Sequence, residues 1–558
     1  MGAQQPIVIC GVWLGGLSIL PALATFAYAG VPTVERITPI ANPVTRLPQG
    51  QLLIEPVWRQ DAAPVPSLPL RGLRIDGDAQ AFVPHDVLGL VGHPITPELI
   101  AKIETLISLD LSTDAWPVIA RYEPTPDAAS GVLTFGVRRF TVAKVTAKGA
   151  PPRDARFVET RLGVSPGAAV DPGALAFDLD SLNRYPFRQV SVKVSPAPGT
   201  SQADVAVDIT EAKPWSAFWG YKYSGGPHES WRRAYAGGSI GDLLGQDSVL
   251  SLQVTESPNA LVRSAHHPDL SDADLTYTQP VDDRGIIEAG YELTGMNFKF
   301  PSDTYWLVES DGTLGYRYLL TGPAAAGGQS DVRAGIDLRH ERVMDFESRG
   351  LVFNMTAEMN ELYLGYHFNQ ARTSQQTDFD ISLRLSPAVD MPGNTPSHFA
   401  LYTSGRMKSA RYGYVNFTLD ETVGDASGTR WHTQLIGGGA SGPLPYYDQA
   451  ILGGQGNVRG YFLPDGSFDD ALIWRNELKW TPKSGWLKNL SPYWLADIGV
   501  GHDDQLKVTK TLASAGFGVA VPVAKTVSWN LDLVHALRHA AVTQAGNTVV
   551  ETNLKVSY

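Results

Sequence analysis

A single cation stands among glycines in the stretch GGQGNVRGYFLPDG, which runs from Gly453 to Gly466. The stretch is too rich in glycine for a helix and too irregular for a strand, so it indicates a loop. Arg459 is therefore either a solvated residue of an exposed hairpin or a guanidinium placed inside the protein. In the second case it needs a carboxylate partner, because an unpaired buried charge is costly.

Three other stretches carry reactive residue types. GGSIG, Gly237–Gly241, fits the G-x-S-x-G pattern of a serine nucleophile, but an alternating strand follows where that motif needs a helix. GGGASG, Gly437–Gly442, fits G-x-G-x-x-G without a surrounding βαβ unit. His266 and His267 are adjacent and lack a third metal ligand at a suitable spacing. We therefore expect no catalytic residue, no metal site and no cofactor, and the protein is not expected to be an enzyme.

Composition narrows the class of protein. The chain has 558 residues, a net charge of -12 and a pI near 5.5, which argues against nucleic acid as a partner. Its 55 glycines and 9% aromatic residues indicate a β-rich fold with many turns. Residues 1–29 form a nearly uncharged apolar run that ends in Ala27-Tyr28-Ala29 and contains Cys10, the only cysteine of the sequence. We expect a cleaved signal peptide there, with a membrane anchor or a misplaced start codon as alternatives.

The next part of the chain divides into a linker and two modules. Residues 30–69 hold eight prolines and are expected to form an extended linker. Two α+β modules follow, at residues 70–139 and 140–213, each expected to have the order strand, helix, helix, strand, strand. In the first module, Thr96 is expected to cap a helix that has Pro97 in its first turn.

The remaining segment, residues 214–558, has no convincing helical period and alternates apolar with polar residues. Typical alternating runs are Leu250–Val254, Ile287–Leu293, Val332–Leu338, Phe379–Leu385 and Trp529–Leu533. A bilayer accepts a sheet only when no edge is left open, so these strands must close on themselves. The segment has 558 − 213 = 345 residues, which gives about 22 residues for each strand and loop of a 16-stranded barrel. We therefore expect a mainly β fold, with a 16-stranded antiparallel transmembrane barrel preceded by the two α+β modules, and a water-filled lumen.

These features together resemble the TpsB transporters of two-partner secretion, the haemolysin secretion/activation family within the superfamily of the BamA insertase. The resemblance covers the chain beyond the linker. Four stretches carry it: LDSLNRYP at Leu179–Pro186 with the segment up to Trp215, SIGDLLGQDSVLSLQ at Ser239–Gln253, the GGQGNVRGY loop, and YWLADIGVG at Tyr493–Gly501. It implies a signal peptide, two periplasmic POTRA modules and a 16-stranded barrel in the bacterial outer membrane.

The resemblance also implies a place for the glycine-rich loop. In the family this loop folds back into the lumen, and its arginine pairs with an aspartate of the inner wall. These two residues map onto Arg459 and Asp497, with Leu495 expected to face lipid while Asp497 faces inward. Six residues make up the expected site: Val458, Arg459, Gly460, Tyr461, Asp497 and Gly499.

The partners follow from the resemblance as well. The POTRA modules are expected to capture an unfolded exoprotein, haemolysin-like or adhesin-like, by strand addition to a sheet edge. The exoprotein then threads the lumen without nucleotide hydrolysis, which agrees with the lack of a Walker A sequence. The candidate edge strands are represented by Val190, Val192, Val194, Val205, Val207 and Ile209. Outer-membrane lipid and the machinery that inserts barrels are further expected partners, and the chain is expected to act as a monomer.

Two alternative functions belong to other classes. An insertase of the BamA type would carry more POTRA modules than the two found here, and a passive porin would need neither the modules nor the loop. One departure from the family concerns a helix that plugs the pore. The prolines of residues 30–69 leave room only for a short turn near residues 49–60.

Overall fold

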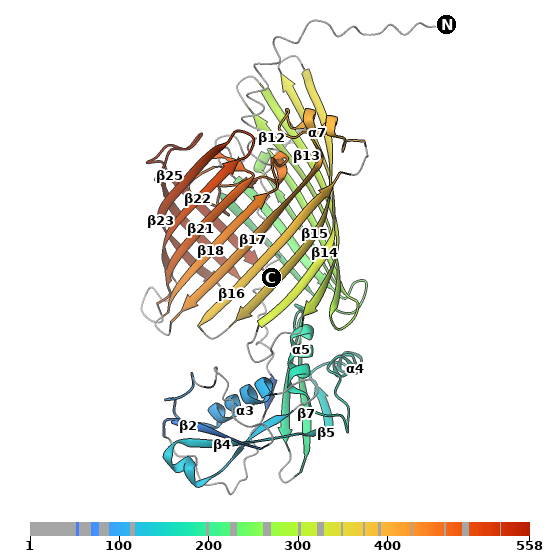
Figure 1. Ribbon diagram of the computed structural model, residues 1–558, viewed down its shortest axis with the longest axis vertical. Helices are drawn as coiled ribbons and strands as arrows, with labels where there is room; N and C mark the ends of the chain where they lie inside the picture. Colours follow the sequence, from blue (N-terminus) through green and yellow to red (C-terminus); the bar gives the residue numbers. More distant parts are fainter. Residues whose placement is uncertain are drawn as a thin grey trace, which may run out of the picture.

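The computed structural model of the protein places two small α+β units below a large β-barrel (Figure 1). It describes residues 52–54, 68–77, 87, 89–111, 118–196, 200–223, 232–259, 269–299, 303–320, 328–347, 350–371, 374–388, 392–425, 428–462, 465–482, 490–524 and 526–558. The expected signal peptide and most of the expected linker lie outside these ranges.

The first unit is a three-stranded sheet covered by one described helix. It contains β2 (Gly72–Gly77), α3 (Pro97–Leu111), β3 (Ile119–Glu123), the 3-10 turn η2 (Pro126–Ser130) and β4 (Val132–Arg138). The sheet has the order β2-β4-β3, with β2 parallel and β3 antiparallel to β4. The predicted start of the helix is confirmed, because Thr96 Oγ1 accepts a hydrogen bond from the Leu99 N–H at 3.2 Å and the helix begins at Pro97.

The second unit has the predicted order strand, helix, helix, strand, strand. Its elements are β5 (Thr141–Lys148), α4 (Pro152–Arg161), α5 (Pro172–Leu182), β6 (Arg188–Pro196) and β7 (Gln202–Glu211). The side chain of Asp171 caps α5 by accepting hydrogen bonds from the N–H groups of Gly173 and Ala174 at 2.8 and 3.1 Å. Leucines of α5 and valines of the sheet form one buried cluster.

The prediction that β6 and β7 offer free edges is wrong. The sheet has the order β1-β6-β7-β5, so β7 is central, between antiparallel β6 and parallel β5. On its other side β6 pairs in parallel with β1 (Leu52–Ile54), a strand from the expected linker, at a place where the prolines were expected to leave room only for a short turn. The six candidate residues are 3% exposed or less and belong to the core: Val190, Val192, Val194, Val205, Val207 and Ile209.

The barrel closes with 16 strands, as predicted, and every neighbouring pair is antiparallel. In order these are β8 (Trp215–Tyr223), β9 (Arg232–Gly241), β10 (Val249–Glu256), β11 (Leu270–Pro280), β12 (Gly285–Lys299), β13 (Asp303–Leu320), β14 (Gly328–Glu347), β15 (Gly350–Ala371), β16 (Gln375–Pro387), β17 (Arg411–Gly424), β18 (Thr429–Ala440), β21 (Asp470–Trp480), β22 (Ser491–Asp503), β23 (Val508–Ala524), β24 (Val527–Ala536) and β25 (Thr548–Ser557). The last strand, β25, pairs with the first, β8, and leaves no open edge.

The barrel has its apolar residues outside and its charges inside. On β14, Leu338 is 53% exposed, whereas its neighbours Asp337 and Arg339 are 2% and 4% exposed. The same inversion places Leu364, Trp474 and many other large apolar side chains on the outer surface. A soluble β-sandwich has the opposite arrangement, so this surface is built to face lipid.

Among the described residues, no helix combines the length and the hydropathy that are needed to cross a bilayer.

Candidate functional site: a loop held inside the barrel

The glycine-rich stretch belongs to a long segment that connects β18 to β21. We call residues 441–469 the lumen loop; it contains the 3-10 turn η4 (Tyr446–Asp448) and the short pair β19 (Ala450–Ile451) and β20 (Ser467–Phe468). Its apolar side chains pack against the inner wall and are buried. This cluster joins Leu452, Val458, Tyr461 and Phe468 of the loop to Ile473 and Leu512 of the wall.

Arg459 lies inside the barrel and contacts two carboxylates. Its Nε and Nη2 donate to the two carboxylate oxygens of Asp497, both at 2.7 Å, and its backbone N–H donates to Asp497 Oδ2 at 3.2 Å. Its Nη1 donates to Glu477 Oε1 at 2.6 Å. The side chains of Arg459 and Asp497 are 3% and 0% exposed. The guanidinium thus clamps the loop to the adjacent strands β21 and β22 through charge-assisted bonds.

Two glycines allow the loop to lie this close to the wall. A Cβ on Gly499 would lie 2.7 Å from Cγ2 of Val458, so a side chain at this wall position would push the loop away. Gly460 has a φ of +79°, and a Cβ there would lie 2.9 Å from Val534 Cγ1. Asp497 and Gly499 are therefore adjacent inward positions of one strand, the first binding the loop and the second making room for it.

Tyr461 extends the contact to the next strand and loop. Its hydroxyl lies 2.8 Å from the carbonyl oxygen of Ala513 and accepts a hydrogen bond from the N–H of Arg538 at 2.9 Å. Asp465 accepts from the N–H groups of Val542 and Thr543, both at 2.9 Å. These contacts hold the loop against the barrel well beyond the arginine.

The six residues expected at this site all lie together: Val458, Arg459, Gly460, Tyr461, Asp497 and Gly499. The expectation for Leu495 is wrong. Leu495 and Asp497 are two residues apart and so share a face of the strand, and Leu495 is buried with Tyr493 and Val534.

Sequence reasoning missed the second carboxylate, Glu477, because inward charges of the strands were interpreted as a hydrated wall. Its place beside the site follows only from the strand pairing, because β21 pairs with β22 and Glu477 lies opposite Leu495, two residue pairs away from the pair of Arg475 and Asp497. Arg475 was missed as well. Its guanidinium donates to the carbonyl oxygens of Gly456 and Gln455 of the lumen loop at 3.0 and 3.1 Å.

A second arginine fastens the base of the lumen loop. The segment between β16 and β17 carries helix α7 (Pro396–Tyr402) and then Arg406, whose side chain is fully buried. Its Nη2 donates to Asp469 Oδ1 at 2.6 Å, its Nη1 to Asp503 Oδ2 at 2.8 Å, and its Nε to the Leu444 carbonyl oxygen at 2.8 Å. This cation joins the segment between β16 and β17 to the lumen loop and to the last residue of β22, and α7 of that segment lies at the end of the barrel remote from the α+β units (Figure 1).

The turn η4 of the lumen loop is bonded to another part of the barrel wall. The Nη1 atom of Arg339 on β14 lies 2.9 Å from Asp448 Oδ1, and its guanidinium lies 3.7 Å from the ring centre of Tyr447. The lumen loop is therefore attached to β14 on one side and to β21 and β22 on the other.

The second unit docks on the other end of the barrel. Arg188 makes a bidentate pair with Asp247 in the turn between β9 and β10, with distances of 2.8 and 2.6 Å. The Tyr185 hydroxyl donates to Asp242 of the same turn at 2.6 Å. Arg161 of α4 pairs with Asp283 in the turn between β11 and β12.

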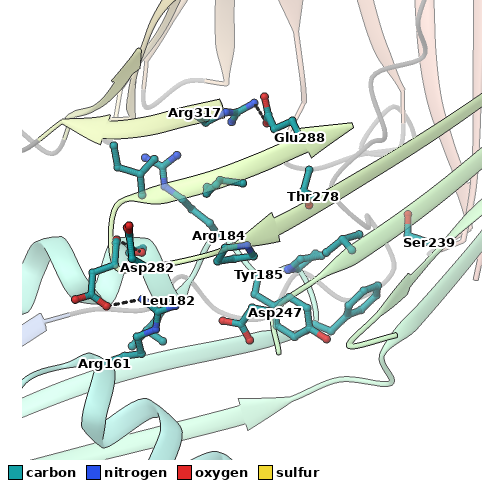
Figure 2. A pocket seen from close by; sticks show the side chains of 18 of the residues that line it. Arg161, Leu182, Arg184, Tyr185, Ser239, Asp247, Thr278, Asp282, Glu288 and Arg317 are labelled. Carbon is teal, nitrogen blue, oxygen red and sulfur yellow. Dashed lines mark hydrogen bonds and ion pairs between the residues drawn. The ribbon is translucent and has the colours of Figure 1, made fainter. Parts of the chain in front are cut away.

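A cavity of about 460 Å³ lies at this junction. Figure 2 shows Leu182, Arg184 and Tyr185 of the second unit below it, and Arg317 and Glu288 of the barrel wall above it. Arg317 Nη2 lies 2.5 Å from Glu288 Oε1. Arg184 Nη1 lies 3.7 Å from Asp331 Oδ2 at the start of β14, so the end of α5 reaches the lumen wall.

The other motifs form no site. Gly237–Gly241 lies within β9 and Gly437–Gly442 at the end of β18, so neither has the strand-turn-helix context of a nucleophile or nucleotide loop. His266 and His267 lie outside the described residues. Among the residues that the structure describes, no cluster of three histidine, cysteine or carboxylate side chains is placed to hold a metal ion.

Comparisons with known proteins agree with this geometry. Residues 356–521 match the sequence model of the family described as haemolysin secretion/activation protein ShlB/FhaC/HecB. The solved structure of CdiB from Escherichia coli is similar, with a TM-score of 0.62, 13% identity and full coverage of both chains. CdiB from Acinetobacter baumannii has a TM-score of 0.61 and 14% identity, over 97% of this chain and 99% of that one. Curated protein sequences give no match.

Proposed function

We propose a transport mechanism for this chain on the premise that it belongs to the haemolysin secretion/activation family ShlB/FhaC/HecB, the outer-membrane transporters of two-partner secretion. In the proposed mechanism the protein receives an unfolded exoprotein in the periplasm and passes it through the barrel to the cell surface. The chain would act as a monomer, since its barrel is closed by its own strands.

One observation carries the proposal. The lumen loop is held inside the barrel by non-covalent contacts whose centre is the pair of Arg459 with Asp497. The wall behind it is lined with charged and hydroxyl side chains, which a hydrated polypeptide can pass without burying its backbone groups in lipid. The loop is thus a reversible closure across a polar path.

The two α+β units are proposed to be POTRA modules that recruit the exoprotein. Supporting this, the second unit is bonded to the turns at one mouth of the barrel through Arg188 and Arg161. An exoprotein held by the second unit would lie beside the cavity at the mouth, which Figure 2 shows between this unit and the barrel wall. Main-chain hydrogen bonding at a sheet edge suits an unfolded client, because it reads few side chains.

Transport is proposed to need no nucleotide. Nothing in the sequence resembles a phosphate-binding loop of the Walker A type. Folding of the exoprotein outside the cell supplies a free-energy difference, of roughly 5–15 kcal/mol for an ordinary domain, that makes the passage one-way.

The test is deletion of residues 70–213 from the chain, with export of a co-expressed candidate exoprotein measured in the culture medium. Insertion of the barrel is checked by surface labelling. We expect export to collapse while the barrel still inserts. Unchanged export would show that the units do not recruit the client. Depletion of other barrel proteins from the outer membrane on loss of the whole chain would favour the insertase alternative.

A further inference from the structure

The outer face of four neighbouring strands carries an apolar groove. The strands are β17, β18, β21 and β22, which follow one another around the barrel (Figure 1). A row of directly paired residues crosses all four of them: Leu419, Leu435, Trp474 and Ile498. Together with Leu472 and Val500, these side chains line a groove of about 410 Å³. The groove belongs to the surface that faces the bilayer, so a lipid is the molecule that covers it.

A row of polar residues borders the groove. The next outward positions of β17, β18 and β21 hold Glu421, Thr433 and Asn476, which are directly paired across the strands. The indole N–H of Trp474 donates to Thr433 Oγ1 at 2.8 Å, and Thr433 Oγ1 lies 3.0 Å from Asn476 Oδ1. The Trp474 ring is thereby fixed at the boundary between the groove and the polar row.

Glu421 gives this polar row a negative charge. Its carboxylate accepts hydrogen bonds from Thr377 Oγ1 at 2.6 Å and from Gln375 Nε2 at 2.7 Å. Both donors are neutral, so they do not compensate the charge of the carboxylate. A charged side chain on the lipid face of a barrel is unfavourable, and an opposite charge in the adjacent headgroup layer offsets that cost.

The level of the polar row in the membrane follows from the tryptophans beyond it. On the same outer face Trp431, Trp480 and Trp494 are 46%, 47% and 67% exposed. Exposed aromatic rings at one level mark the boundary of the hydrocarbon layer. Strand β17 begins after α7, which lies remote from the α+β units, so these tryptophans lie at the end of the barrel near the units (Figure 1). From the middle of the membrane toward that end, the wall therefore presents an apolar groove, a polar row and an aromatic belt.

We propose that this face binds one phospholipid of the periplasmic leaflet that has an ammonium headgroup. One acyl chain lies in the groove against Leu435 and Trp474, the glycerol ester region lies on the polar row, and the ammonium pairs with Glu421. The order of apolar, polar and cationic parts along such a lipid matches the order along the wall. The inference does not depend on the proposed transport function.

Binding at this face differs from the general contact of a barrel with lipid. Inside a bilayer every lipid chain is apolar, so apolar attraction alone does not favour one part of the wall over another. Selectivity needs shape and charge. The groove with the fixed Trp474 ring supplies the shape, and Glu421 supplies the charge. The same carboxylate repels a lipid with an anionic headgroup.

The experiment is a lipid titration of the full chain in detergent, in which native mass spectrometry counts the bound lipids. The probes are phosphatidylethanolamine and phosphatidylglycerol with identical acyl chains. Leu435→Trp fills the groove. Its matched control is Leu364→Trp on β15, because Leu364 is a lipid-facing leucine, 56% exposed, that does not line the groove. Glu421→Gln removes the charge and leaves the groove as it is.

We expect the wild-type chain to bind one phosphatidylethanolamine about tenfold more tightly than phosphatidylglycerol, a factor that one charge-assisted hydrogen bond supplies. Leu435→Trp should weaken binding of phosphatidylethanolamine about tenfold, since the loss of about ten carbon contacts amounts to that factor. Leu364→Trp should leave this binding unchanged, and Glu421→Gln should bind the two lipids equally.

Equal binding of phosphatidylethanolamine by Leu435→Trp and the wild-type chain, or an equal weakening by Leu364→Trp, would overturn the groove as a lipid site. A preference for phosphatidylethanolamine that persists in Glu421→Gln would overturn the pairing of the ammonium with this carboxylate and the lipid class with it. Should Leu435→Trp fail to fold, the headgroup preference of Glu421→Gln still tests the site.

Discussion

Replacing Arg459 by lysine keeps the positive charge but removes the branched, planar guanidinium group. The guanidinium reaches Asp497 through two nitrogen atoms and Glu477 through a third. A lysine ammonium is a single point that cannot span these carboxylates in the same way. At least one charge-assisted hydrogen bond to a buried carboxylate is lost, worth about 1.5–3 kcal/mol, and a second one doubles that figure. A loss of about 3 kcal/mol in the free energy that holds the loop to the wall raises the population of the released loop roughly 100-fold.

The assay is the rate at which a thiol placed in the loop reacts with an external maleimide. Val458 is fully buried, so a cysteine at that position reacts only when the loop leaves the wall. In the Cys10→Ser background, Arg459→Lys should raise this rate about 100-fold, since the rate follows the released population. The matched control is Arg411→Lys, an exposed arginine at the start of β17. Equal rates with and without Arg459→Lys, or an equal rise with Arg411→Lys, would refute the clamp.

Three further outcomes are expected. Gly499→Val should displace the loop without any change of charge, because the new side chain would meet Val458, and should raise ion conductance in planar bilayers. Gly290→Ala is the control and should leave the conductance unchanged, since no atom lies within 3.5 Å of the new Cβ. Arg406→Ala leaves two buried aspartates without their cation, at a cost of about 3–5 kcal/mol, and should lower the temperature at which the barrel unfolds in detergent; an unchanged temperature would contradict the clamp. Burial raises the pKa of Glu104 from 4.5 to about 8, so between these pH values the folded first unit holds a proton that the unfolded chain has released. The free energy of unfolding therefore falls with rising pH, by up to about 1.4 kcal/mol per pH unit. Glu104→Gln should flatten this slope in denaturation measured at several pH values, and an equally steep slope would argue against the buried carboxyl.

The barrel could be predicted because period-two alternation is a direct record of which face meets lipid. Leu338 between Asp337 and Arg339 shows this in three residues. The pair of Arg459 with Asp497 could be located because two short stretches that resemble the family, GGQGNVRGY and YWLADIGVG, contain these residues. No local pattern marks Glu477, since an inward carboxylate has the same spacing whether it meets water or an arginine.

The sheet edges were predicted wrongly for a topological reason. Alternating valines show that β6 and β7 are strands with one buried face, but they carry no information on lateral order. The last strand, β7, lies between the two strands that precede it in sequence. The strand at Leu52–Ile54 was also missed, because three residues among prolines are too few to establish a period.

The lumen loop is bonded at Asp448 to one side of the tube and at Arg459 to another. A strut that crosses a thin-walled cylinder resists flattening of its cross-section. The lumen loop would therefore help the barrel wall to resist compression by the lateral pressure of the bilayer. In the proposed export, an exoprotein that frees one end of the loop would let the cylinder become oval and would let its width adjust to the exoprotein.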